Sequence, residues 1–355
     1  MKKKKTQTKK STRKKRVAIL SGGGDCPGIN PVIRAIVRKG LQAGYELIGI
    51  KNGWKGLVEK EFIELDLESV SGILPRGGTI LGTSRTNPYK SKNQVQKAKA
   101  NYKSLGIEAL IAIGGEDTLG VANSLHKEGL NLVGVPKTID NDLSATDRTF
   151  GFDTAVNIAT EAIDRIHTTA ESHHRVMVVE VMGRHSGWIG LEAGLAGGAD
   201  TILIPEFPID LDEVCALIKQ RHSRGKNFSI IVIAEGARFK EGTEVLQDTE
   251  LDAFGHVKLG GIGQILAKEV QKRTWFETRV TVLGHIQRGG SPTAYDRVLG
   301  TRYGVKAMEL VIQKKFGQMV SLQGNTIVSV PLREAVGTLK TVPRELYEIA
   351  RLFFG

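Results

Sequence analysis

The sequence predicts an α/β protein built on doubly wound, mainly parallel β-sheets. Short apolar runs of strand length alternate along the chain with longer stretches in which apolar residues recur every three to four positions. Several of these runs are continuously apolar, which is typical of parallel strands that are buried on both faces. Two of them lead directly into glycine-rich loops, as strands do at the carboxyl edge of an open α/β sheet.

The individual elements follow from the same patterns. The apolar run at 17–20 ends at a glycine loop and fits a first buried strand, and the apolar face of 29–41 fits a helix that stops before Gly44. Further strands are expected at 46–50, 109–113, 131–135, 176–181, 202–204, 229–234 and 279–283. Further helices are expected at 94–105, directly after Thr118, and at 152–169, 210–223, 261–272 and 298–313.

Composition limits the class of protein. The 355 residues allow one large domain or two ordinary ones, and 40% hydrophobic with 25% charged residues exclude a disordered chain and a coiled coil. No apolar stretch approaches the roughly 20 residues that a membrane span needs. Two cysteines, Cys26 and Cys215, cannot form a disulfide framework, and no signal peptide is evident, so we expect a cytoplasmic protein without membrane contacts.

The net charge of +12 is concentrated at the start of the chain. Ten lysines and arginines and no acidic residue lie in 1–16, so the remaining residues carry a net charge of only +2. We expect 1–16 to be a disordered basic tail. Two interpretations stay open: a solubilising extension, or an arm that binds nucleic acid or another anionic surface.

Two of the loops that follow predicted strands have the composition of phosphate and metal sites. The glycines of 22–28, which include Gly23 and Gly24, could bring backbone N–H groups to a phosphate at a helix N-terminus. Glu116 and Asp117 follow another strand and could bind Mg²⁺ through carboxylate oxygens. A purely structural turn and a helix start favoured by acidic residues are the alternatives.

A third loop, 136–142, combines a lysine, a hydroxyl and two aspartates. Asp140 could accept a proton from a substrate hydroxyl during phosphoryl transfer, and Lys137 could neutralise phosphate charge. The alternative is an ordinary turn rich in Asp and Asn.

Basic residues complete the pattern. Arg184 follows one strand, Glu235 ends another, and Arg279, His285 and Arg288 lie along and after a third. Arginine binds phosphate oxygens through two parallel hydrogen bonds. These residues alone predict a Mg²⁺-dependent phosphotransferase with an anionic donor and a phosphorylated acceptor.

Six segments, in this order, resemble the 6-phosphofructokinase family: GGGDCPGIN, RGGTILGTSR, IGGEDT, PKTIDND, HHRVMVVEVMGRHSGW and TRVTVLGHIQRGGSP. The resemblance extends from Val17 to about Lys314. It implies two doubly wound domains with the active site in the cleft between them, and transfer of a phosphoryl group to the 1-hydroxyl of fructose 6-phosphate. It also implies a donor domain at 17–151 plus about 288–336, and a sugar-phosphate domain at 152–287 plus about 337–355.

The resemblance further implies roles for individual residues. Asp140 matches the catalytic base, with Lys137, Thr138, Asp142 and Asp117 also in the catalytic set. Glu116 matches the Mg²⁺ ligand, where the common bacterial enzymes have aspartate. The residues that it implies for binding the phosphoryl donor are Gly23, Gly24 and Arg85. The acceptor residues are Thr138, Ile139, Asp140, Met182, Gly183, Arg184, Glu235, His285, Ile286, Gln287 and Arg288, joined by Arg175 and Arg279 from across a subunit interface, which requires a homodimer or homotetramer.

Two positions bear on the phosphoryl donor. Family members that use ATP commonly have glycine where this chain has Asp117 and Lys137, and these two substitutions are similar to those of the pyrophosphate-dependent branch. A carboxylate where the α-phosphate of ATP would lie repels that phosphate, and a lysine offsets charge on pyrophosphate. We therefore expect pyrophosphate as the donor, with an ATP-dependent enzyme as the alternative and a binding protein that acts through its basic tail as a remote one.

Overall fold

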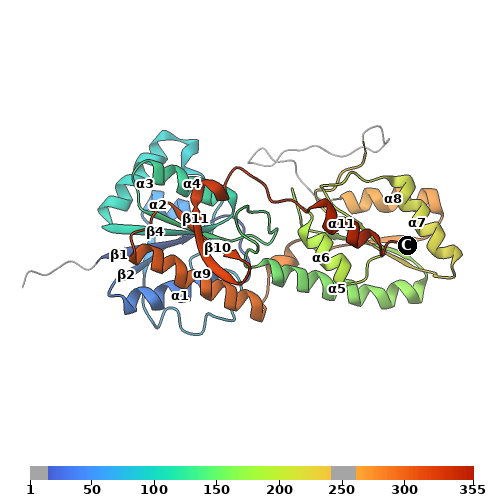
Figure 1. Ribbon diagram of the computed structural model, residues 1–355, viewed down its shortest axis with the longest axis horizontal. Coiled ribbons are helices and arrows are strands. Elements are labelled where there is room, and N and C mark those ends of the chain that lie inside the picture. Colours follow the sequence, from blue (N-terminus) through green and yellow to red (C-terminus); the bar gives the residue numbers. More distant parts are fainter. Residues whose placement is uncertain (1–14, 241–260) are drawn as a thin grey trace, which may run out of the picture.

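The computed structural model describes residues 15–240 and 261–355, and these form two β-sheets, each flanked by helices (Figure 1). The first sheet has seven strands in the order β11-β10-β5-β4-β1-β2-β3, and the second has four in the order β7-β8-β6-β9. Figure 1 shows the two sheets in separate halves of an elongated molecule, with α5 in the half of the second sheet. The basic tail predicted for 1–16 lies outside the described residues, except that Lys15 is described and β1 begins at Arg16.

The first sheet is parallel at its centre and antiparallel at both edges. Its strands are β1 (Arg16–Ser21), β2 (Glu46–Ile50), β3 (Phe62–Leu65), β4 (Ile107–Gly114), β5 (Leu132–Pro136), β10 (Gln318–Gln323) and β11 (Thr326–Pro331). Only the pairs β2–β3 and β10–β11 are antiparallel. Alternate residues of β1 enter different parts of the core, because successive side chains of a strand point to opposite faces: Val17 and Ile19 lie in one cluster, Ala18 and Leu20 in another.

Helices cover both faces of this sheet. They are α1 (Ile29–Gln42), α2 (Trp54–Glu59), α3 (Lys92–Ser104), α4 (Glu116–Lys127), α9 (Ala294–Ile312) and α10 (Leu332–Ala335), with a short 3₁₀ helix at Pro88–Lys90. Helices α1 and α9 pack along each other, and both bury apolar residues in the cluster that contains Val17 and Ile19. The sheet is therefore enclosed, as its continuously apolar strands predict.

The second sheet is entirely parallel. It consists of β6 (Val176–Val181), β7 (Thr201–Leu203), β8 (Ser229–Ala234) and β9 (Thr278–Val282). Its helices are α5 (Phe152–His173), α6 (Trp188–Ala196), α7 (Leu211–Ser223), α8 (Ile262–Thr274) and α11 (Arg344–Arg351), and a 3₁₀ turn follows β9 at Gly284–Arg288. The predicted α/β class with mainly parallel sheets is confirmed.

The predicted elements lie where the patterns placed them, within a few residues, but several elements were not predicted. These are α2, β3, α6, the β10–β11 hairpin, α10 and α11. Helix α6 is apolar except for Glu192, so no 3.6-residue alternation of apolar and polar residues marks it. The hairpin turns at Gly324 and Asn325, a two-residue pair that favours a tight hairpin and is its local signal.

We propose the division into a donor domain and a sugar-phosphate domain at the boundaries given above, and the sheet topology supports it. The first sheet takes all its strands from residues 16–136 and 318–331, and the second takes its strands from 176–282. Helix α11, at the end of the chain, packs against α6 and β7 of the second sheet.

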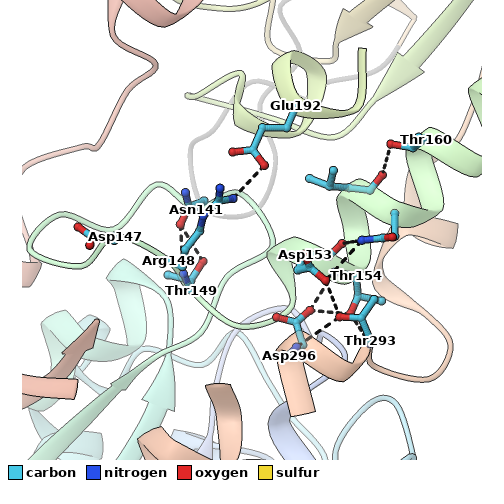
Figure 2. A network of polar contacts seen from close by, with 12 residues as sticks. Asn141, Asp147, Arg148, Thr149, Asp153, Thr154, Thr160, Glu192, Thr293 and Asp296 are labelled. Carbon is cyan, nitrogen blue, oxygen red and sulfur yellow. Dashed lines mark hydrogen bonds and ion pairs between the residues drawn. The ribbon is translucent and has the colours of Figure 1, made fainter. Parts of the chain in front are cut away.

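A buried polar network joins the two halves where α5 and α9 begin (Figure 2). One carboxylate oxygen of Asp296, on α9, accepts hydrogen bonds from the backbone N–H and the hydroxyl of Thr154 on α5, at 2.8 and 2.5 Å. Thr293 caps α9 through the N–H of Asp296 and also donates to Asp153. Burial raises the pKa of Asp296 to about 6. These bonds fix the start of one half's long helix against the other half.

Among the helices of the described residues, none combines the length and the apolar character that a membrane crossing requires.

Candidate active site

Three of the predicted loops meet at one edge of the first sheet. They follow β1, β4 and β5, which are neighbours and run parallel, so their carboxyl ends lie together. From β1 the chain continues to β2 on one side of β1, whereas β4 pairs with β1 on its other side. In an open α/β sheet a ligand binds in the crevice where the strand order reverses, which here is between β1 and β4. The loops at this point, 22–28 and 115–118, are those that the sequence predicts for the phosphoryl donor.

The loop after β1 is bound to residues from both halves. The ammonium group of Lys137 donates to the carbonyl of Gly24, and Nη1 of Arg288 donates to the carbonyl of Asp25 at 3.2 Å. A Cβ on Gly24 would lie 2.2 Å from Nη1 of Arg288, so a side chain there would displace the guanidinium group. Gly23 donates its N–H to Ser84 at 3.0 Å. The loop is thereby held beside two cations.

Lys137 is almost fully buried, with 4% of its surface exposed. Burial lowers the pKa of its ammonium group, and Arg288 lowers it further, while Asp25 and Asp140 raise it. A desolvated lysine interacts strongly with an added anion, because its charge is not screened by water.

Asp140 lies where the two halves meet. Its carboxyl group interacts electrostatically with four charged residues from loops of both sheets: Arg288, Glu235, Lys137 and Arg184. Burial raises the pKa of Asp140, Glu235 raises it further, and the three cations lower it. Its Oδ1 is buried and has no hydrogen-bond partner in the part of the chain that the structure describes. An orphan buried carboxylate oxygen with a raised pKa is the arrangement a general base needs.

Asp142 belongs to the same loop and lies close enough to Glu116 for the two charges to interact. Burial raises the pKa of Asp142 to about 6, with a further contribution from the negative charges of Asp140 and Glu116, while a hydrogen bond from Thr138 lowers it. The Thr138 hydroxyl also accepts the N–H of Asp140 at 3.0 Å. The carboxylates are therefore close enough to repel one another, and a cation beside them would relieve that repulsion.

These oxygens fit Mg²⁺ in one specific sense. Among the described residues, no group of three or more acidic, histidine or cysteine side chains is arranged to hold a metal alone. Mg²⁺ in phosphoryl-transfer sites is commonly bound by one or two carboxylates together with substrate phosphates and water. Glu116 and Asp142 are hard oxygen ligands of that kind, and Glu116 is at the first residue of α4.

Asp117 and Arg85, predicted for the donor side, are both exposed. Asp117 is the second residue of α4, shortly after the carboxyl end of β4, so it lies at the edge of the sheet to which the crevice belongs. Arg85 follows the segment 82–84, in which Thr83 and Ser84 bind the main chain of Gly23.

Most of the predicted acceptor residues lie at the carboxyl ends of the second sheet's strands, whereas Thr138, Ile139 and Asp140 follow β5 of the first sheet. Their side chains differ in access. Arg184 and Glu235 follow β6 and β8 and bear on Asp140, and Ile286 is exposed in the turn after β9, which also carries His285. Three others support the loops from within: Ile139 and Met182 are buried, and Gln287 is fully buried, accepting from Met182 N–H and donating to Gly284. Gly183 accepts the N–H of Gly236 at 3.0 Å.

Arg175 and Arg279 lie away from this cluster. Arg175 directly precedes β6 and Arg279 is near the start of β9, whereas Arg184 and Arg288 follow the far ends of those strands. The whole length of β6 separates Arg175 from Met182, a span of about 20 Å. Both arginines pair with Glu277, at 2.9 and 2.5 Å. Within one chain they cannot share a ligand with Arg184.

Two contacts at the site were not predicted. Ser186 donates to the carbonyl of Asp140 at 3.2 Å, which ties the loop that carries Asp140 to the loop after β6. Gly77 lies against Gly290, where a Cβ would be 2.0 Å from the carbonyl oxygen, so only glycine permits this approach of 76–78 to the loop after Arg288. The paired glycines in both segments are the only sequence signal of this contact.

The sequence is similar to those of known phosphofructokinases. The profile of the phosphofructokinase family matches residues 16–311. A protein of Streptomyces coelicolor named pyrophosphate–fructose 6-phosphate 1-phosphotransferase is 59% identical over 96% of this chain and 100% of its own length. A protein of Corynebacterium efficiens named ATP-dependent 6-phosphofructokinase is 54% identical over 96% of this chain and 99% of its own.

Among solved structures, phosphofructokinase of Pichia pastoris in the T-state aligns with a TM-score of 0.81 and 34% identity. The alignment covers 96% of this chain and 39% of that one, so this chain spans less than half of the yeast protein. Profile, relatives and fold agree, and the chain belongs to the phosphofructokinase family.

Proposed function

We propose that this protein transfers a phosphoryl group from pyrophosphate to the 1-hydroxyl of fructose 6-phosphate. The products are fructose 1,6-bisphosphate and phosphate, and the reaction is reversible, as the resemblance to the pyrophosphate-dependent branch implies. Such an enzyme serves glycolysis in one direction and gluconeogenesis in the other. A cytoplasmic location agrees with Cys26 and Cys215, which are both unpaired and buried.

One observation carries the choice of donor. Asp117 is an exposed acidic residue at the carboxyl edge of the first sheet, and Lys137 places a buried ammonium group against the carbonyl of Gly24. A longer donor would bring further phosphates past Asp117, whereas pyrophosphate ends before it and gains a cation at its inner end. Overall identity does not decide the question, because relatives named for either donor differ by only a few percent in identity.

The residues around Asp140 support the transfer step. A carboxylate oxygen of Asp140 accepts the proton of the 1-hydroxyl while the hydroxyl oxygen attacks the nearer phosphorus of pyrophosphate. The bond from that phosphorus to the bridging oxygen breaks, and phosphate leaves with the bond's electron pair. Lys137 and Arg288 lie beside Asp140 and stabilise the negative charge that develops on the transferred and leaving groups.

Mg²⁺ is the cofactor that these residues fit. Glu116 and Asp142 would hold it, and when bound it neutralises phosphate oxygens of the donor. Arg184 and Glu235 orient the sugar phosphate: the guanidinium binds anionic or hydroxyl oxygens, and the carboxylate accepts from sugar hydroxyls.

The reverse direction gives a test that separates the two donors. Incubated with fructose 1,6-bisphosphate, phosphate and Mg²⁺, the protein should release pyrophosphate, which a pyrophosphatase-coupled or ³¹P NMR assay detects. ATP formation from the same bisphosphate with ADP, and no pyrophosphate, would instead support the second candidate, an ATP-dependent 6-phosphofructokinase, which the Corynebacterium relative's name favours.

The active assembly is at least a homodimer in this proposal, with Arg175 and Arg279 binding the 6-phosphate in the partner's site. Their position at the opposite end of the second sheet supports this. Strand β9 is a sheet edge, and beside it Trp275 is 89% exposed and Val282 is 50% exposed. A depression of about 650 Å³ in the same region is lined by Trp275 and Arg279. An exposed edge with these side chains suits burial against a second copy.

Mixed assemblies test the shared site. Arg279→Ala and Asp140→Asn should each be nearly inactive alone, the first through a raised KM for fructose 6-phosphate. When the two variants are mixed, dissociated and reassembled, the mixture should regain up to about a quarter of wild-type activity. About half of the dimers then contain one copy of each variant, and one of the two sites in such a dimer has both Asp140 and Arg279 intact. Lys99→Met, on α3, is the matched control that should leave activity unchanged. No recovery in verified hetero-oligomers would contradict the shared site.

A further inference from the structure

The segment Gly337–Val342, here called the C-terminal strap, passes from the half of the first sheet to the half of the second (Figure 1). On the way it runs beside the loop that carries Asp140. Leu339 forms an antiparallel bridge with Leu143, and the N–H of Lys340 donates to the carbonyl of Asp142 at 2.9 Å. The strap therefore extends the backbone hydrogen bonding of the catalytic loop.

The strap is attached to both halves at its ends. At its start, the N–H of Gly337 donates to the carboxylate of Glu116 at 3.2 Å. At its end, the N–H of Val342 donates to the carboxylate of Glu206 at 2.9 Å, and Glu206 also accepts the N–H of Gly187 at 3.0 Å, at the start of α6. One short segment thus touches the predicted metal ligand, the catalytic loop and the second half.

Lys340 adds further connections to these backbone hydrogen bonds. Its ammonium group donates to the carbonyls of Thr146 and Asp147, at 3.1 and 2.6 Å, and lies 5.1 Å from the centre of the Trp188 ring. The indole N–H of Trp188 donates to the carbonyl of Lys340 at 3.0 Å. Lys340 therefore binds the catalytic loop at two places, at Asp142 through its backbone N–H and at Thr146 and Asp147 through its ammonium group, and it connects the loop to α6 through Trp188.

We propose that Lys340 is a positioning residue for phosphoryl transfer: it holds the loop around Asp140 in the reactive arrangement while the two halves are docked. The inference rests on the proposed function. Lys340 donates to carbonyls of this loop, and Oδ1 of Asp140 has no hydrogen-bond partner among the described residues, so the position of that oxygen depends on the backbone. A displacement of about 1 Å at a reacting group can reduce the rate by roughly 10²-fold.

Charged groups on two elements face the Lys340 ammonium group. Asp142, Asp147 and Arg148 belong to the loop, and Glu192 belongs to α6, where it pairs with Arg148 at 2.9 Å (Figure 2). Burial lowers the pKa of Lys340 to about 8, Arg148 lowers it further, and the carboxylates raise it. The ammonium group of Lys340 is therefore held among charged groups of both the loop and α6.

The test compares Lys340→Met, Lys340→Arg and the control Lys99→Met, which removes an ion pair with Glu128 at a comparable lysine far from the loop. Lys340→Met should lower kcat by about 10- to 10²-fold with KM for fructose 6-phosphate within about twofold. Lys340→Arg should restore most of kcat, since arginine keeps the positive charge and can donate hydrogen bonds to the same carbonyls. Lys99→Met should match the wild type.

Thermal midpoints and Trp fluorescence, measured on the same samples, separate positioning from folding. An unchanged kcat in folded Lys340→Met would overturn the inference, and so would a kcat of Lys340→Arg as low as that of Lys340→Met. If Lys340→Met does not fold, Trp188→Phe decides, because it removes the indole hydrogen bond to the carbonyl of Lys340: an unchanged kcat there would overturn the inference. Asp140→Asn is run alongside: if it keeps full activity, the proposed catalytic base is wrong, whereas a dead Asp140→Asn with a normal Lys340→Met rejects only the role of Lys340.

Discussion

Asp140→Asn is expected to lower kcat by roughly 10³-fold, within the range that general bases contribute, while KM for fructose 6-phosphate changes little. The amide keeps the size of the carboxyl group but cannot accept the proton of the 1-hydroxyl. In the wild type, the base must be ionised, and burial raises its pKa. The rate should therefore fall on the acid side at a pH above the ordinary range of an aspartate, and steady-state assays from acid to neutral pH measure both effects.

The matched control for this substitution is Asp164→Asn on α5, which removes one exposed carboxylate from the second half. It should leave kcat and its pH dependence unchanged. If Asp140→Asn retained more than about a tenth of the wild-type kcat, Asp140 would be excluded as the general base of the reaction.

Asp117→Gly is expected to admit ATP. Two like charges about 4 Å apart repel by roughly 4 kcal/mol at an effective dielectric constant near 20, and exposure of Asp117 to solvent reduces that value. We therefore expect kcat/KM for ATP to rise by about 10²-fold in the variant, which is about 2.7 kcal/mol of transition-state stabilisation. The rate with pyrophosphate should change far less, because that donor ends before residue 117.

Asp212→Gly controls for the loss of an acidic residue at the second position of a helix, since Asp212 occupies that place in α7. It should not change donor use. Combining Asp117→Gly with Lys137→Gly should also lower kcat/KM for pyrophosphate, because the cation against Gly24 is removed. A double variant that still used pyrophosphate at the wild-type rate would contradict the role assigned to Lys137.

The strands and amphipathic helices could be predicted from the sequence because their signals are local. The run from Ala109 to Ile113 is buried on both faces, and α1 has one apolar face, so each pattern reports its own environment. Helix α6 and the β10–β11 hairpin were missed for opposite reasons. The first has no polar face, and the second is marked by a two-residue turn rather than by a long apolar run.

The site was partly predictable for a related reason. Loops that follow neighbouring parallel strands must converge, so the composition and order of 22–28, 114–118 and 136–142 are enough to group them. The residue types did not reveal which side chains face the crevice: Gln287 and Ile139 are buried, and Arg175 and Arg279 lie at the opposite end of their strands. The strap at Lys340 could not be predicted at all, because it contacts residues nearly 200 positions earlier in the chain.

The central claim is that a short anionic donor is used at a site built around Asp140, Lys137 and Asp117. Its most direct test measures kcat/KM of the wild-type protein for pyrophosphate and for ATP, with fructose 6-phosphate and Mg²⁺ and with formation of fructose 1,6-bisphosphate as the readout. We predict turnover with pyrophosphate and a value for ATP at least about 10²-fold lower, the factor expected from charge repulsion at Asp117. Equal or faster turnover with ATP would contradict the account of the donor site.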